Sequence, residues 1–165
     1  MANILCGVSH PSAFDAKHDI TWSFKYCLSG NGGTTGIFST FLYNAPSLKF
    51  TALSAVSGSF YNVNFNSIYN SLTVNGSVST VLPFTVKASS EMYRVLRFQF
   101  TDVGQTLNVF YRSLSTEFTL ITSLNVGSAI LSSTPLRVGV SYRSPITGDK
   151  ARFRIKDFHV QGMSI

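Results

Sequence analysis

The chain has 165 residues, of which 12% are charged and 13% are aromatic. A chain of this length can bury the core of one domain without disulfides or metals. Its low charge and its apolar content exclude a disordered protein and argue against a coiled coil or a helical bundle. No apolar run approaches the roughly 18 residues of a membrane-spanning helix, so membrane insertion is not expected.

The charge balance is basic, with 13 Lys and Arg against 7 Asp and Glu, a net charge of +6. Such a surface attracts nucleic acid, anionic lipid or an acidic protein. The basic residues stand singly along the predicted strands rather than in runs, so nucleic acid is not an expected partner.

The N-terminal residues do not predict export of the protein from the cell. Met1 to Val8 have neither the basic segment nor the long apolar stretch of a signal peptide, so we expect synthesis in a cytoplasm. Cys6 and Cys27 form no metal-binding motif, and two reduced thiols are the expected state. The sequence leaves open whether the two cysteines are paired.

Apolar and polar residues alternate with a period of two along most of the chain, which predicts β-strands. In the first strand Ile20, Trp22 and Phe24 share one face. Residues 37–43 are nearly all apolar and predict a central strand. Asn75-Gly76 is a strong two-residue hairpin signal. The expected strands are residues 20–28, 37–43, 48–53, 61–66, 72–74, 78–82, 92–101, 106–112, 118–124, 136–142 and 151–161.

Short turns between these segments predict an all-β fold, an antiparallel sandwich of two sheets. One helical turn is allowed within residues 125–133. Residues 1–18 contain Pro11 and few alternating positions, so they predict an irregular N-terminal arm. Residues 19–165 then form one jelly-roll domain.

A candidate glycan site lies where amides alternate with apolar and aromatic residues. Asn side chains can donate to and accept from sugar hydroxyls, and Tyr rings can stack on the C–H faces of sugars. An Asn ladder on a solvent face and a protein–protein contact are the alternatives. The candidate residues are Tyr61, Asn62, Asn64, Asn66 and Tyr69.

A basic stripe on the last strand is the second candidate surface. Arg152, Arg154 and Lys156 alternate with Phe153 and Ile155, and Arg137 is expected to lie near them. The stripe either protects a sheet edge from aggregation or docks on an acidic partner. Phe158 and Val160 fall out of phase with Phe153 and Ile155, which predicts a β-bulge at residues 157–158.

The ordered set of strand motifs resembles the concanavalin A-like lectin and glucanase family over roughly residues 19–162. This resemblance implies a jelly roll and is not specific for a function, because the fold hosts lectins, glycanases, adhesion modules and capsid proteins. The segments that carry it are Asp19–Tyr26, Gly36–Tyr43, Gly104–Tyr111, Phe118–Leu120, Leu136–Ser141 and Phe153–Val160.

The family's enzymatic and metal-dependent chemistries lack their residues in this sequence. Its glucanases place paired carboxylates at alternate positions of one strand. Here Glu91 and Glu117 have no acid two residues away. Its legume-type lectins use a metal site built on a Glu-x-Asp strand, which is absent. Asp15, His18 and Asp19 could ligate a cation but are expected to be solvated.

The sequence therefore predicts a binding or structural protein without cofactor or metal, not an enzyme. It resembles short lectin-like structural proteins of tailed phages. The expected role is a virion component, a capsid decoration or a tail or fibre part that contacts virion proteins and its own copies. Weak adhesion to cell-surface glycans would accompany this role. The alternative is a metal-independent, carbohydrate-binding lectin that uses the Asn and Tyr face.

Overall fold

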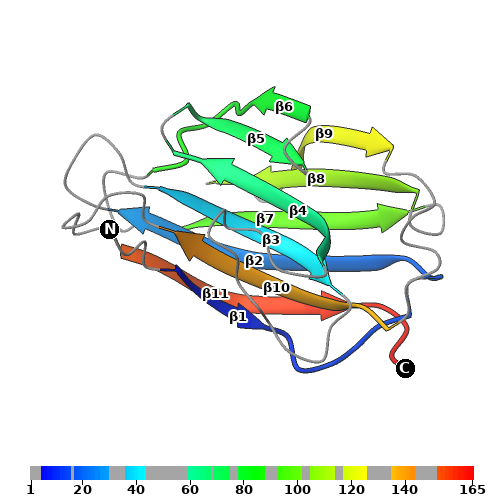
Figure 1. Cartoon of the computed structure of the whole chain (residues 1–165). Helices are drawn as coiled ribbons and strands as arrows, with labels where there is room; N and C mark the ends of the chain where they lie inside the picture. Colours follow the sequence, from blue (N-terminus) through cyan, green and yellow to red (C-terminus); the bar gives the residue numbers. More distant parts are fainter. Residues whose placement is uncertain are drawn as a thin grey trace. The chain divides into compact units, whose positions relative to one another are not determined.

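The computed structural model describes residues 5–15, 17–29, 36–43, 59–67, 69–74, 78–87, 93–101, 105–113, 117–125, 135–143 and 152–165. The side chains of residues 5, 6, 59–61, 78 and 79 lie outside this description. Within it, strands form two sheets, no helix occurs, and no segment could cross a membrane as a helix (Figure 1).

The chain divides into two compact units, and each unit is built from three separate segments of the sequence. One unit comprises Met1–Ser9, Cys27–Met92 and Gly139–Arg154, and the other comprises His10–Tyr26, Tyr93–Val138 and Ile155–Ile165. The boundary between an arm at residues 1–18 and a single domain at 19–165 stays a prediction.

The five-stranded sheet has the order β11-β2-β7-β8-β9. The ladders from β2 to β9 are antiparallel, and a bulge interrupts the last of them between Val109 and Phe110. Its strands are β11 (Arg152–Gln161), β2 (Ile20–Ser29), β7 (Arg94–Thr101), β8 (Thr106–Arg112) and β9 (Thr119–Asn125).

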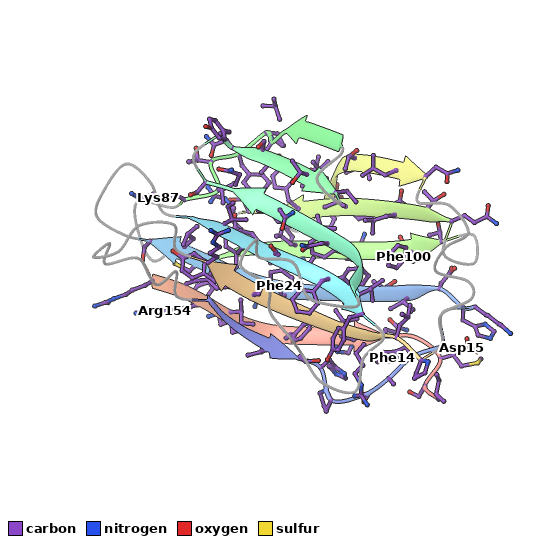
Figure 2. All side chains as sticks on the ribbon, viewed as in Figure 1. Phe14, Asp15, Phe24, Lys87, Phe100 and Arg154 are labelled. Carbon is purple, nitrogen blue, oxygen red and sulfur yellow. The ribbon has the colours of Figure 1, made fainter. Side chains whose placement is uncertain are left out.

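Alternation gives this sheet one face of buried aromatic rings. Trp22 and Phe24 of β2 lie opposite Phe98 and Leu96 of β7 and are at most 1% exposed. The Trp22 and Phe98 rings stack with centroids 5.1 Å apart. Figure 2 labels two members of this cluster, Phe24 on β2 and Phe100 on β7. Such rings contribute large buried area and favourable offset contacts.

The six-stranded sheet has the order β1-β10-β3-β4-β5-β6, and its ladders β1–β10, β3–β4, β4–β5 and β5–β6 are antiparallel. Val74 and Val78 pair across the predicted Asn75-Gly76 hairpin, whose turn lies outside the described residues. The strands are β1 (Leu5–Ser9), β10 (Arg137–Arg143), β3 (Ile37–Tyr43), β4 (Ser59–Asn66), β5 (Ser71–Val74) and β6 (Val78–Val81).

Strand β3 is buried on both of its faces, as its uninterrupted apolar sequence predicts. Phe38 stacks on Phe65 of β4 with centroids 4.7 Å apart. On the opposite face, the Phe41 ring lies against the backbone of Gly139 on β10, where an added Cβ would clash with it. Gly139 is therefore required by this close approach.

The N-terminal arm is more regular than the sequence predicts. Residues 5–9 are strand β1, which pairs with β10 from Leu5↔Arg143 to Ser9↔Gly139. Phe14 is 4% exposed, and its N–H and C=O exchange hydrogen bonds with Leu136 at 2.8 and 2.9 Å. The prediction of an irregular arm is wrong for these residues, because long-range pairing with β10 orders a segment too short to show a pattern.

The predicted bulge in the last strand is confirmed. Asp157 has a φ of 53°, and Lys156 and Asp157 are exposed in succession. The alternation then resumes with a buried Val160. One residue in the left-handed region thus shifts the phase, so that both halves of β11 keep their apolar residues on one side.

Some expectations fall outside the described residues. They are the strand at 48–53 and the helical turn at 125–133, of which residue 125 ends β9. Cys27 is buried and is not part of a disulfide.

Candidate functional site

The amides of β4 lie on one face of the six-stranded sheet. Val63 and Phe65 point to the other face and are at most 1% exposed. In register, Asn62 lies opposite Phe41 and Asn64 lies opposite Ser39 on β3. We call this surface the Asn64 face; it comprises Ser39, Phe41, Asn62, Asn64, Asn66 and Ser141.

The Asn64 face is only partly exposed. Asn62 is 8% exposed and Ser39 is fully buried, whereas Asn64 and Asn66 are half-buried. The alternative of an Asn ladder on a solvent face therefore does not hold at Asn62. The sequence could not show this, because the burial depends on position in the sheet and not on alternation.

Two hydrogen bonds orient the amides. The Ser39 Oγ donates to Asn64 Oδ1 at 2.5 Å. The Tyr69 N–H donates to Asn66 Oδ1 at 3.3 Å, which places the Tyr69 backbone beside Asn66. The bond from Ser39 occupies the side-chain oxygen of Asn64. Its Nδ2 has no protein partner among the described residues, so it remains available as a donor.

Of the two tyrosines in the predicted site, the structure describes the side chain of one. Tyr69 is 73% exposed, in the turn between β4 and β5. Tyr61 belongs to β4, but its side chain lies outside the described part of the structure. Tyr69 is thus the tyrosine whose backbone lies beside Asn66 and whose side chain is exposed to solvent.

Strand β10 extends the Asn64 face with a residue that the sequence analysis missed. Gly139 faces Phe41, and Ser141 follows it at the next position on the same side. Ser141 is 1% exposed, and its Oγ has no hydrogen-bond partner within the described residues. No local signal could reveal this, because Ser141 reaches the face only through the pairing of distant strands.

The basic stripe is only partly assembled as predicted. Arg152 and Arg154 are exposed on β11, and Lys156 lies 3.9 Å from the centroid of the Tyr93 ring. Arg137 instead donates from Nη1 to the Pro11 carbonyl at 2.6 Å, so it holds the N-terminal arm. A docking role for these four residues stays a prediction.

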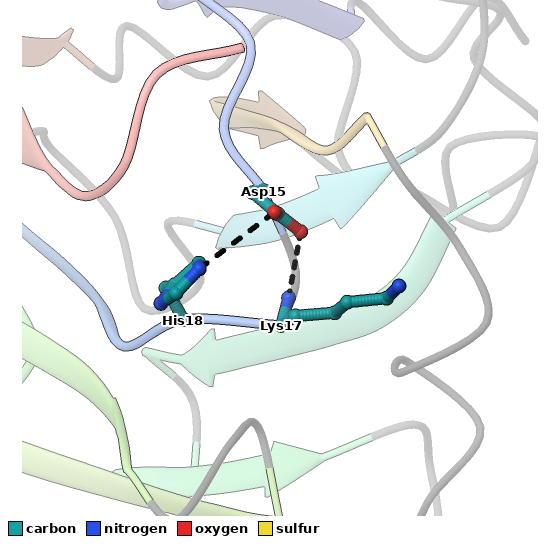
Figure 3. Close-up of polar contacts among 3 residues, drawn as sticks. All are labelled: Asp15, Lys17 and His18. Atoms are coloured by element: carbon teal, nitrogen blue, oxygen red, sulfur yellow. Dashed lines mark hydrogen bonds and ion pairs between the residues drawn. The ribbon is translucent and has the colours of Figure 1, made fainter.

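A small open hollow of about 310 Å³ lies beside the N-terminal arm. It is lined by Asp15 and Lys17 of the arm and by Pro135 and Ile165. Figure 3 shows that Asp15 is engaged locally: Oδ1 accepts from the Lys17 N–H at 3.0 Å, and Oδ2 is 3.9 Å from His18 Nε2. This carboxylate closes a turn of its own segment. Among the described residues, no three His, Cys, Asp or Glu side chains gather as metal ligands.

Among the described titratable groups, Asp157 has a pKa that departs from its ordinary value. A hydrogen bond and the charge of Lys25, whose Nζ is 2.7 Å away, lower the pKa of this exposed carboxyl below its ordinary value. A general acid needs a raised pKa, so Asp157 is unsuited to that role.

Comparison with solved structures gives strong structural similarity at low sequence identity. Lectin II from Ulex europaeus has a TM-score of 0.74 at 10% identity, over 97% of this chain and 82% of its own. The carbohydrate recognition domain of Emp47p has a TM-score of 0.71 at 12% identity, over 98% and 79%. The winged bean acidic lectin, complexed with methyl-α-D-galactose, has a TM-score of 0.72 at 11% identity, over 94% and 78%.

The chain has the concanavalin A-like jelly-roll fold. The predicted class, an all-β antiparallel two-sheet sandwich, is confirmed, as is the resemblance to this lectin superfamily. No protein-family model matches the sequence. No curated protein sequence matches it either. None of these structures points to a virion, so that interpretation stays a prediction.

Proposed function

We propose that the protein binds carbohydrate without catalysis, and that the Asn64 face with Tyr69 is its glycan site. The observation that carries this proposal is the set of uncharged polar groups on one sheet face. Ser39, Asn62 and Ser141 are at most 8% exposed, and Asn64 presents an amide donor beside them. Polar side chains are seldom buried and are normally hydrogen-bonded when they are, so the Ser141 Oγ, which has no partner within the described residues, makes this face unusual.

The chemistry of this face suits an uncharged sugar. Sugar hydroxyls both donate and accept, which matches the amide Nδ2 of the half-buried Asn64. The exposed Tyr69 ring can pack on the C–H face of a pyranose. The six residues of the Asn64 face are uncharged, which favours neutral sugars, and the next residue on the same side of β10 after Ser141 is Arg143.

The structural neighbours support binding rather than catalysis. Among them, the lectin UEA-II is complexed with galactose, and the Bauhinia forficata lectin is complexed with GalNAc. At 10% and 12% identity these similarities carry the fold to this chain and not the sugar.

A glycan array followed by calorimetry tests the proposal. We expect millimolar or tighter binding of a neutral glycan, reduced about tenfold or more by Asn64→Ala and by Tyr69→Ala, the loss of one or two good contacts. Tyr69→Phe keeps the ring and should retain binding. Asn108→Ala, which removes a half-buried amide on β8, is the matched control.

Binding of every variant at the wild-type level would place the site elsewhere and contradict the proposal. So would the absence of any binding across an array of neutral glycans. Co-sedimentation with capsids, with no response to sugars, would favour the virion role that the sequence predicts.

A further inference from the structure

One face of the five-stranded sheet carries cations that lie on aromatic rings. The Arg97 Cζ is 4.7 Å from the Phe110 ring centroid and 4.1 Å from that of Phe118. The Arg112 Cζ is 4.8 Å from the same Phe118 ring. We call this surface the Arg97 face; it comprises Lys25, Arg97, Phe110, Arg112, Phe118 and Lys156.

The strand register brings these residues together. Arg97 of β7 lies opposite Phe110 of β8, and Phe110 lies opposite Leu120 of β9. Phe118 precedes Leu120 by two positions and shares its side of the strand. Val95, two positions from Arg97, lies between Lys25 on β2 and Arg112 on β8. The cations are therefore fixed by backbone pairing.

The Arg97 face has an excess of positive charge. Lys25, Arg97, Arg112 and Lys156 contribute four cations. Asp157 forms a 2.7 Å ion pair with Lys25, and Glu117 lies next to Phe118 in the chain. The face as defined therefore carries more cations than anions, which favours an anionic partner.

Among the cations of the Arg97 face, Arg97 is the one best placed to bind a ligand. Its guanidinium makes no ion pair or hydrogen bond with any described residue, and its Nε is buried without an acceptor. The Phe110 and Phe118 rings contact the guanidinium and restrict its rotation. An arginine held in this way offers the edge of its planar fork to a carboxylate or a sulfate.

We propose that the Arg97 face binds an anionic polysaccharide through its carboxylate or sulfate groups. A polymer with repeated charges can contact the cations of β2, β7 and β8 at once, whereas a single small anion contacts fewer of them. Single-stranded nucleic acid fits less well, because its bases need free aromatic faces and the cations already lie on these rings. The proposal does not depend on the glycan site of the Asn64 face.

Dextran sulfate and uncharged dextran of equal length test the proposal by calorimetry on the full chain. We expect dextran sulfate to bind more tightly than dextran, with an affinity that falls as salt rises. Arg97→Gln/Arg112→Gln should weaken binding at least tenfold. Lys17→Gln/Lys87→Gln removes the same charge from other segments and should weaken it less than threefold. Asn64→Ala should leave it unchanged.

Circular dichroism and Trp22 fluorescence establish that each variant folds. If the double arginine variant does not fold, Lys156→Gln replaces it, with an expected two- to fivefold loss. Equal losses in the arginine and lysine variants would show attraction by net charge only and overturn the proposal. Equal binding of dextran, of a single-stranded oligonucleotide or of polyglutamate would also overturn it.

Discussion

Gly139 lies on β10 where the Phe41 ring leaves no room for a side chain. Gly139→Ala should therefore destabilise the protein by about 1–3 kcal/mol through overpacking. Urea denaturation followed by the fluorescence of Trp22, the single tryptophan, measures this change. Phe41→Leu should recover part of the loss in the double variant, whereas simply additive effects would show that the ring is not the obstacle.

Asp157 is a residue whose ionisation the structure links to one partner. Lys25 lowers its pKa, so the ion pair contributes to stability above the carboxyl's ordinary pKa. The contribution is lost as the pH falls through the lowered value in the folded state. An NMR titration should show the Asp157 pKa below the ordinary range in the wild type and raised in Lys25→Met. The same pKa in both proteins would contradict the assigned cause.

At the scale of elements, the sequence predicted β3 and β8 to the residue, because alternation or an apolar run continues up to a turn signal. The bulge at Asp157 was also predictable, because a phase slip is visible in the sequence. Strand β1 was not, since Leu5–Ser9 are ordered by β10 more than a hundred residues away.

The arm is also an element whose attachment can be measured. Phe14 is 4% exposed and bridges Leu136 and Ser164, so Phe14→Ala should cost about 3 kcal/mol. Pro11→Ala removes an exposed side chain but keeps the carbonyl that accepts from Arg137, so it should cost less than about 0.5 kcal/mol. Equal costs in urea denaturation would mean that Phe14 does not anchor the arm.

At the scale of the whole molecule, the two sheets present different chemistry. The Asn64 face is uncharged and partly buried, and the Arg97 face is cationic with its rings already occupied. The sequence predicted the fold class, and it predicted that the amides of β4 share one face of the strand. It could not predict Ser141, which reaches the Asn64 face through strands distant in sequence, or the Arg97–Phe118 pair, which depends on the register of three consecutive strands.

An NMR titration with a panel of neutral mono- and oligosaccharides tests the central claim most directly, because it locates the bound sugar. We predict that the Asn64 side-chain amide and the Tyr69 backbone amide shift in a saturable way. The amides of Arg97, Phe110 and Phe118 should stay unchanged. Shifts confined to other strands, or no saturable shift with any neutral sugar, would contradict the assignment of a glycan site to the Asn64 face.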